Sequence, residues 1–314
     1  MKLIIKLSLA LVLFASCTQN EMEGSDQIRL GVKSDAYTRA SVNDVTGLVA
    51  VGNKIGVYGV KTKESNASDL LSDDWILAPL MNNVCTKSID TDGKMFFSEI
   101  YTYSDEQNVK FCAYYPYAKV GTTGANYVEV AQGKAPLLHF TLTGEEDVMY
   151  STPVMGSRTS PDNKVLLFNH ALTQLRFKLV DANGIMTDAK VTRISFEGAN
   201  TTSTLNIETG EFGVWGTPSN DIKVKTDYPF SVKGQELADV KVMLQPGLSN
   251  FTLNIATDKN GTYAGIKIKP DRTATFEAGT SYLITLTFLD KTEMFAKATV
   301  QPWVMGGYGE GIVQ

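Results

Sequence analysis

Residues that commonly carry catalysis or bind metals are scarce in this 314-residue sequence. It contains two histidines, His139 and His170, and three cysteines, Cys17, Cys85 and Cys112. No Gly-x-Ser-x-Gly, His-Glu-x-x-His, Cys-x-x-Cys or Walker pattern occurs. We therefore expect a protein that is not an enzyme and that needs no metal or other cofactor. The formal net charge of -5 repels phosphate backbones, so nucleic acid is not an expected partner.

The remaining polar and aromatic candidates have structural interpretations. His170 opens an alternating apolar stretch, and we expect a hydrogen-bonded structural role for it. Cys85 and Cys112 are interpreted either as a possible disulfide, given export, or as two separate buried thiols. Tryptophans and tyrosines could form a sugar-stacking platform, although in a strand-rich protein they usually belong to the core. The aromatic residues concerned are Trp75, Trp215, Trp303, Tyr114, Tyr115 and Tyr117.

The first 39 residues predict export and a tether. Two lysines precede a short apolar run at residues 7–16, as in a secretory signal, and the run is too short to span a bilayer. Small residues stand before Cys17, and this resembles the lipobox of bacterial lipoproteins. We predict a signal peptide at 1–16, acylation of Cys17, and a lipid-anchored tether with a removable strand at 17–39. Ordinary signal cleavage with an incidental thiol is the alternative.

Hydrophobic periodicity over the body of the chain predicts strands throughout. Apolar residues alternate with period 2 or cluster in runs of four to eight. The clearest strands are expected at 54–60, 108–115, 174–180, 240–244, 251–256 and 282–288. Asp92-Gly93, Asn183-Gly184 and Asn260-Gly261 predict tight hairpins between strands. The expected fold is all-β, with antiparallel sandwiches.

The length predicts two domains of ordinary size. The most turn-rich stretch near the middle of the chain is residues 156–163. We therefore expect an N-terminal β-sandwich at 40–160 and a C-terminal β-sandwich at 161–314.

Five segments, in order along the chain, resemble the fimbrillin family, the pilin lipoproteins of Bacteroides-type bacteria (Bacteroidales). They are residues 111–117 (FCAYYPY), 147–150 (DVMY), 168–177 (FNHALTQLRF), 276–282 (FEAGTSY) and 299–303 (TVQPW). The resemblance implies two tandem transthyretin-like β-sandwiches, in agreement with the strand pattern.

The resemblance also gives the N-terminal segment an expected role. Ile28, Leu30 and Val32 alternate with polar residues or glycine, as in one strand with a buried face. Similar fimbrillins are cut after an arginine, and here the cut would fall between Arg39 and Ala40. Loss of the strand would expose a groove for a strand donated by another subunit. The implied donor is residues 304–313, with Tyr308 and Ile312 as groove-filling side chains.

The sequence thus predicts a structural pilin, exported as an outer-membrane lipoprotein with acyl (palmitate) chains. An arginine-specific protease would cut it, and strand exchange with other pilin subunits would place it in an extracellular fimbrium that contributes to cell adhesion. The alternative is a surface lipoprotein that does not polymerise, either a glycan-binding module or a component of the pilus tip or anchor.

Overall fold

The computed structural model describes 22 strands and, over the described residues, no helix. The residues described are 26–34, 54–62, 75, 79–104, 107–184, 186, 188–219, 222–229, 234–290 and 294–301. Within these ranges no helix is long and apolar enough to cross a membrane. The expected all-β fold is confirmed.

A seven-stranded sheet dominates the first half of the chain. Its main path runs β1-β11-β9-β6-β2-β3, and β10 also pairs with β6. The strands are β1 (Leu30–Ser34), β2 (Gly56–Thr62), β3 (Pro79–Cys85), β6 (Asn108–Tyr115), β9 (Met149–Ser151), β10 (Val154–Gly156) and β11 (Lys164–His170). The central strand β6 is apolar on both faces, so each face of this sheet carries a core.

The two faces of this sheet are covered differently. One face packs on a three-stranded sheet of β7 (Tyr127–Glu129), β8 (Leu137–Thr141) and β15 (Thr202–Asn206). The other face is covered in part by the chain around the hairpin of β4 (Ser88–Ile89) and β5 (Met95–Phe96), which contributes Met95 and Tyr103 to the second core.

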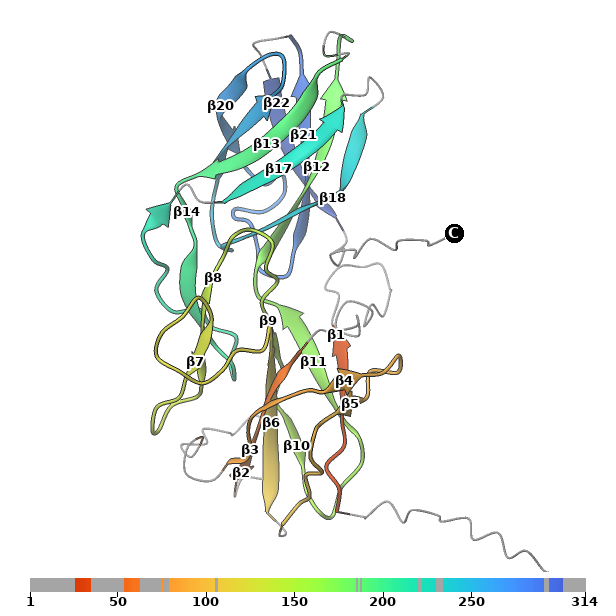
Figure 1. Ribbon diagram of the computed structural model, residues 1–314, viewed down its shortest axis with the longest axis vertical. Helices are drawn as coiled ribbons and strands as arrows, with labels where there is room; N and C mark the ends of the chain where they lie inside the picture. The colour runs from red at the N-terminus through yellow and green to blue at the C-terminus, as the bar shows by residue number, and fades with distance from the viewer. Residues whose placement is uncertain are drawn as a thin grey trace, which may run out of the picture.

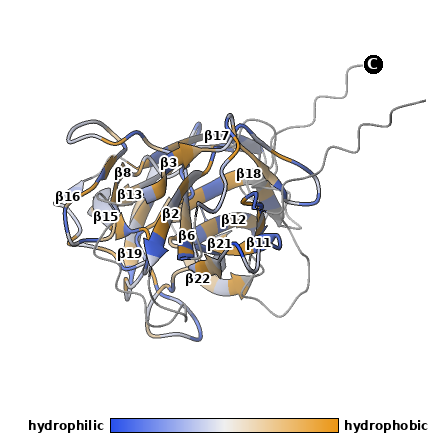
Figure 2. Ribbon diagram, turned by 90° about the horizontal axis from the view of Figure 1, so that it is seen from below, coloured by the Kyte–Doolittle hydropathy of each residue, from blue (hydrophilic) through white to orange (hydrophobic). Residues whose placement is uncertain are grey.

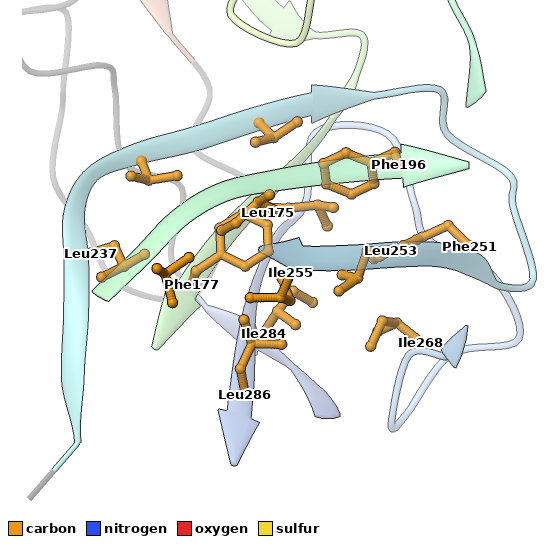
Figure 3. Close-up of a cluster of buried hydrophobic side chains, with 14 of the residues drawn as sticks. Leu175, Phe177, Phe196, Leu237, Phe251, Leu253, Ile255, Ile268, Ile284 and Leu286 are labelled. Carbon is orange, nitrogen blue, oxygen red and sulfur yellow. The ribbon is translucent and has the colours of Figure 1, made fainter. Parts of the chain in front are cut away.

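The second half of the chain forms a sandwich of two four-stranded sheets. One has the order β18-β12-β21-β22 and the other β17-β13-β19-β20. Their inward side chains form one large apolar cluster that includes Phe177, Phe196 and Ile284 (Figure 3). The strands are β12 (Thr173–Asp181), β13 (Lys190–Glu197), β17 (Lys223–Pro229), β18 (Gln235–Leu244), β19 (Phe251–Thr257), β20 (Thr262–Ile268), β21 (Ser281–Phe288) and β22 (Met294–Gln301). A small pair, β14 (Ala199–Asn200) and β16 (Pro218–Ser219), lies beside them.

The strand predictions agree with the structure, but the turn predictions agree only in part. Hydrophobic and hydrophilic residues succeed one another along the strands (Figure 2), and all six of the clearest predicted strands form. Gly93 and Gly261 have positive φ in hairpins, as expected. The hairpin expected at Gly184 is wrong, because β12 and β13 belong to opposite sheets. The pairs β1 with β11 and β12 with β21 are parallel.

The division between the two sandwiches differs from the one expected at residues 156–163. β11 belongs to the first sandwich and β12 to the second, so the chain passes between them at Ala171 and Leu172. Residues 199–219 then return from the second sandwich, and β15 pairs with β8 of the first. The sandwiches are stacked along the long axis of the molecule (Figure 1).

Candidate functional site

The N-terminal strand β1 lies at the edge of the seven-stranded sheet, beside β11 (Figure 1). The two strands are parallel, with Leu30 opposite Lys164 and Val32 opposite Leu166. Neighbouring strands in sequence usually form antiparallel hairpins, whereas this pairing joins segments more than 130 residues apart. β1 is therefore held by contacts remote in sequence, and its neighbours in the chain contribute none of this pairing.

The apolar side chains of β1 enter the core of the first sandwich. Ile28, Leu30 and Val32 are 5%, 0% and 2% exposed. They pack in a cluster with side chains of β6, β11 and the 95–103 segment, among them Met95, Tyr103, Phe111, Leu166 and Phe168. Full burial of one such side chain is worth about 1.5–3 kcal/mol, so the three together anchor the segment. We call the space that they fill the β1 groove.

The second edge of β1 is covered by the chain that follows β4. The Val32 amide donates to the Gly93 carbonyl at 2.7 Å, and the Ile28 amide donates to the Tyr101 carbonyl at 2.8 Å. The Tyr103 amide donates to the Asp26 carbonyl at 2.9 Å. β1 thus lies between two backbone neighbours, as a strand inserted into a slot.

An ion pair closes the N-terminal end of this slot. The Asp26 carboxylate lies 3.0 Å from the Arg158 guanidinium, and both side chains are partly exposed. An exposed pair of this kind contributes about 1 kcal/mol at most. Apolar contacts and backbone hydrogen bonds therefore dominate the retention of β1.

Tyr103 forms part of the groove wall. Its ring meets Phe111 edge to face with centroids 6.3 Å apart, and its hydroxyl is buried without a hydrogen-bond partner among the described residues. Burial raises the pKa of Tyr103 to about 12. The wall beside β1 is thus almost wholly apolar.

Gly31 is the narrowest point of the groove. A Cβ built there would lie 3.2 Å from the Asn163 side-chain amide nitrogen and 3.4 Å from the Gly93 carbonyl oxygen. Gly31 is not among the described glycines with positive φ, so lack of space, and not backbone conformation, favours glycine here. Lys33, two residues on, points to solvent.

This arrangement can hold, release and replace a strand without bond chemistry at the groove. Removal of β1 would uncover the β11 edge, the backbone groups of Gly93 and Tyr101, and the apolar floor. An uncovered edge next to an apolar groove is the arrangement that accepts an added β-strand.

The structure places three of the sequence-predicted site residues together in the groove, namely Ile28, Leu30 and Val32. The predicted lipidation site Cys17, the predicted cut between Arg39 and Ala40, and the donor residues Tyr308 and Ile312 lie outside the described residues.

Cys85 and Cys112 are separate free thiols in the structure, so the possible disulfide is not formed. Gly56 of β2 pairs with Cys85 of β3, and Tyr58 of β2 pairs with Cys112 of β6. The two cysteines therefore lie on strands on opposite sides of β2. Two strand spacings amount to about 10 Å, beyond the Cα separation that a disulfide can bridge.

The other singled-out residues have structural partners. His170 Nδ1 lies 2.8 Å from the Asp147 carboxylate, with both side chains buried or nearly so, in keeping with the expected structural role. His139 Nε2 lies 2.8 Å from the Glu129 carboxylate, and its ring stacks on Tyr127. Within the part of the chain that the structure describes, no cluster of His, Cys, Asp or Glu could hold a metal ion.

The aromatic candidates for a sugar platform are mainly core residues. Trp75 and Tyr114 are 1% and 0% exposed. Trp215 packs against the same cluster and meets Phe140 edge to face. Trp303 lies outside the described residues. The described members of the set offer no shared exposed face for a sugar ring.

A pocket of about 220 Å³ opens at one end of the second sandwich. Its walls include Phe196, Glu197, Asn250 and Phe251. Both phenylalanine rings are buried in the core below it, at 1% and 7% exposure. The pocket therefore lacks the open aromatic face on which sugars stack.

Sequence reasoning identified the side chains that fill the β1 groove but missed those that form it. Met95, Tyr103 and Phe168 lie far apart in the sequence and meet only through the pairing of β1 with β11. Tyr101 and Gly93 act through backbone carbonyls, for which the side chain gives no signal. Asp90 is the one clue, because its carboxylate accepts from the Asp92 and Lys94 amides and so shapes the turn at Gly93.

Comparisons with known proteins agree with this geometry. The fimbrillin-like family model matches residues 38–303, a region that begins after β1. A crystal structure of a candidate cell adhesion protein from Bacteroides uniformis has a TM-score of 0.59 at 20% identity, covering 88% of this chain and 99% of that chain. A fimbrial protein from Bacteroides vulgatus has a TM-score of 0.59 at 15% identity, covering 89% and 100%. At these identities the likeness shows the fold, and no curated protein matches.

Proposed function

The chain belongs to the fimbrillin-like family, and from this premise we propose that it is a structural subunit of a surface pilus that exchanges β1 for a strand of a neighbouring subunit. The observation that carries the proposal is the seating of β1. The strand fills an apolar slot, is hydrogen-bonded along both edges, and joins the rest of the first sandwich only through a connection at residues 35–53.

Processing supplies the trigger in this proposal. A cut between Arg39 and Ala40 severs the connection between β1 and the rest of the sandwich. The strand is then held by noncovalent contacts alone, and a donated strand that makes the same contacts can take its place. The C-terminal segment 304–313 of a pilin subunit, with its residues Tyr308 and Ile312, remains the proposed donor region.

The lipid anchor gives the precursor its proposed location. Acylation of Cys17 would hold the precursor in the outer membrane, and the cut after Arg39 would leave the anchor behind with β1. The processed chain would then pass into an extracellular fimbrium that contributes to cell adhesion. In this role the protein performs no catalysis and needs no cofactor.

Substitution of the cut site tests this function in the native bacterium. We expect Arg39→Ala to keep the protein in the membrane fraction as a monomer, with none in sheared surface fibres. The unchanged protein should form a ladder on gels that resists sodium dodecyl sulfate without heating. Arg193→Ala is the matched control, because Arg193 is exposed on β13 of the second sandwich, remote from the cut.

The result would refute the proposal if Arg39→Ala entered fibres as well as Arg193→Ala did. A protein that stays membrane-bound and monomeric in its unchanged form would support the alternative of a permanently anchored surface lipoprotein.

A further inference from the structure

The shape of the β1 groove specifies which strand can replace β1, and this specificity rests on the proposed function. Three deep positions in the groove hold Ile28, Leu30 and Val32. Between the last two, Gly31 is buried and overlain by Asn163 and the Gly93 carbonyl. The groove thus has three wide positions and one narrow position in a fixed order.

The narrow position is confined on both sides as well as from above. Gly31 pairs with Val165 of β11 on one side and bridges to Lys94 on the other. A strand seated here cannot slide sideways to relieve a clash, because both backbone edges are engaged. A β-branched or larger side chain at this position would have to displace Asn163 and the 93–94 backbone.

Sequence outside the described residues can be compared with this pattern. A strand that fits reads apolar, any residue, apolar, glycine, apolar, and residues 28–32 match it. Among residues 302–314, two windows place a glycine correctly: 304–308 (VMGGY) and 308–312 (YGEGI). Each lacks the central apolar residue, having Gly306 or Glu310 where β1 has Leu30.

Reversal of the strand does not repair the mismatch. The window 308–312 is symmetric about Glu310, so a carboxylate faces the Leu30 position in either direction. Leu30 is 0% exposed, and an unpaired carboxylate there would lose its hydration without gaining a partner. Residues 302–314 of this chain are therefore a poor substitute for β1.

We propose that the β1 groove selects an apolar-x-apolar-Gly-apolar strand donated by a different kind of chain, with Gly31 marking the position that excludes side chains. Identical copies that offer residues 302–314 are disfavoured as donors to this groove. The partner is thus a second pilin whose donated strand carries glycine at the narrow position and a large apolar residue at the Leu30 position.

The first arm of the test uses the intact chain and asks whether the narrow position excludes side chains. We expect Gly31→Val to raise the hydrogen-exchange rate of the Val32 amide by about tenfold or more. Lys33→Val, on the same strand but pointing to solvent, should leave it unchanged. Equal protection of the Val32 amide in the two variants would overturn the proposal.

The second arm measures exchange in the full chain with a sequence-specific protease site in place of residues 36–42. After cutting, fluorescent peptides compete for the groove: residues 26–34, the same peptide with Gly31→Val or Lys33→Val, and residues 304–314 with and without Glu310→Leu. We expect the native 26–34 peptide and its Lys33→Val form to bind equally. The Gly31→Val peptide and the unchanged 304–314 peptide should bind about tenfold or more weakly, and Glu310→Leu should restore binding.

The outcomes separate this inference from the proposed function. Equal binding of the native and Gly31→Val peptides, or of the 26–34 and unchanged 304–314 peptides, would overturn the inference and leave strand exchange standing. Failure of every peptide to bind, the native one included, would refute strand exchange and the inference with it.

Discussion

Lys110 is the most unusual single residue of the first sandwich, because its side chain is fully buried. Its ammonium pairs with the Glu208 carboxylate and lies 5.0 Å from the centre of the Trp75 ring. Glu208 belongs to the segment that returns from the second sandwich, so the pair joins parts of the chain 98 residues apart. Removal of one partner from a buried pair leaves the other charge without compensation.

We therefore predict that Lys110→Ala lowers the free energy of unfolding by about 3–5 kcal/mol, measured in urea. Lys190→Ala is the matched control, because Lys190 pairs with Asp227 on the surface, where both side chains are largely exposed. The control should cost less than about 1 kcal/mol. Similar losses in the two variants would show that the buried pair contributes no more than a surface one.

Tyr103 gives a second prediction at this scale. Its hydroxyl is buried without a partner among the described residues, so Tyr103→Phe should leave the free energy of unfolding at pH 7 unchanged or higher. Burial raises the pKa of Tyr103 in the folded state to about 12, above its ordinary value of 10.0. The ionised form therefore favours unfolding, and stability present below pH 10 is lost as the pH rises towards 12.

Urea unfolding of the two proteins from pH 7 to pH 12 provides the measurement. The stability advantage of Tyr103→Phe should widen above pH 10. An advantage that is constant across this range would mean that the Tyr103 hydroxyl titrates equally in the folded and unfolded chains.

At the scale of elements, the strand returning from the second sandwich matters as much as β1. β15 completes the sheet over β8, and the turn after it places Gly210 against the ring of Tyr150. Gly210 has φ of 74°, and an added Cβ would lie 2.0 Å from that ring. Both backbone conformation and space therefore require glycine at this turn.

Gly210→Ala should lower the free energy of unfolding by clearly more than Gly247→Ala does. Gly247 has φ of 83° with open space around it, so its variant reports the backbone cost alone, about 1 kcal/mol. We expect a further 1–3 kcal/mol or so for Gly210→Ala, because overpacking adds to the same backbone cost. Equal losses would place the 206–210 turn away from Tyr150.

The elements differ in how far the sequence predicts them. The β1 strand is readable because Ile28, Leu30 and Val32 alternate, a local signal. Its parallel partner β11 and the return of β15 to β8 are not readable, because both join segments more than 60 residues apart. The expected boundary at 156–163 fails for the same reason: a turn-rich stretch marks a loop, and β11 after it pairs back into the first sandwich.

At the scale of the whole molecule, the two sandwiches are joined by structure as well as by chain. The connecting residues Ala171 and Leu172 are 2% and 0% exposed. The Ala171 amide donates to Val148 in the first sandwich, and the Leu172 carbonyl accepts from Gly279 in the second. A buried, hydrogen-bonded connection of this kind transmits load along the subunit without a flexible hinge.

We predict that the two sandwiches unfold as one cooperative unit. Differential scanning calorimetry should give a single transition whose calorimetric and van't Hoff enthalpies agree. Two resolved transitions would contradict the shared junction and would make the returning segment 199–219 a weak contact.

The central claim is that β1 is absent from the assembled pilus, and mass spectrometry of sheared surface fibres tests it most directly. The account predicts that this chain begins at Ala40 in fibres and that peptides covering residues 28–34 are missing. The membrane fraction should contain both those peptides and acylated Cys17. Fibres that contain residues 28–34 in equal amount with the rest of the chain would contradict the account.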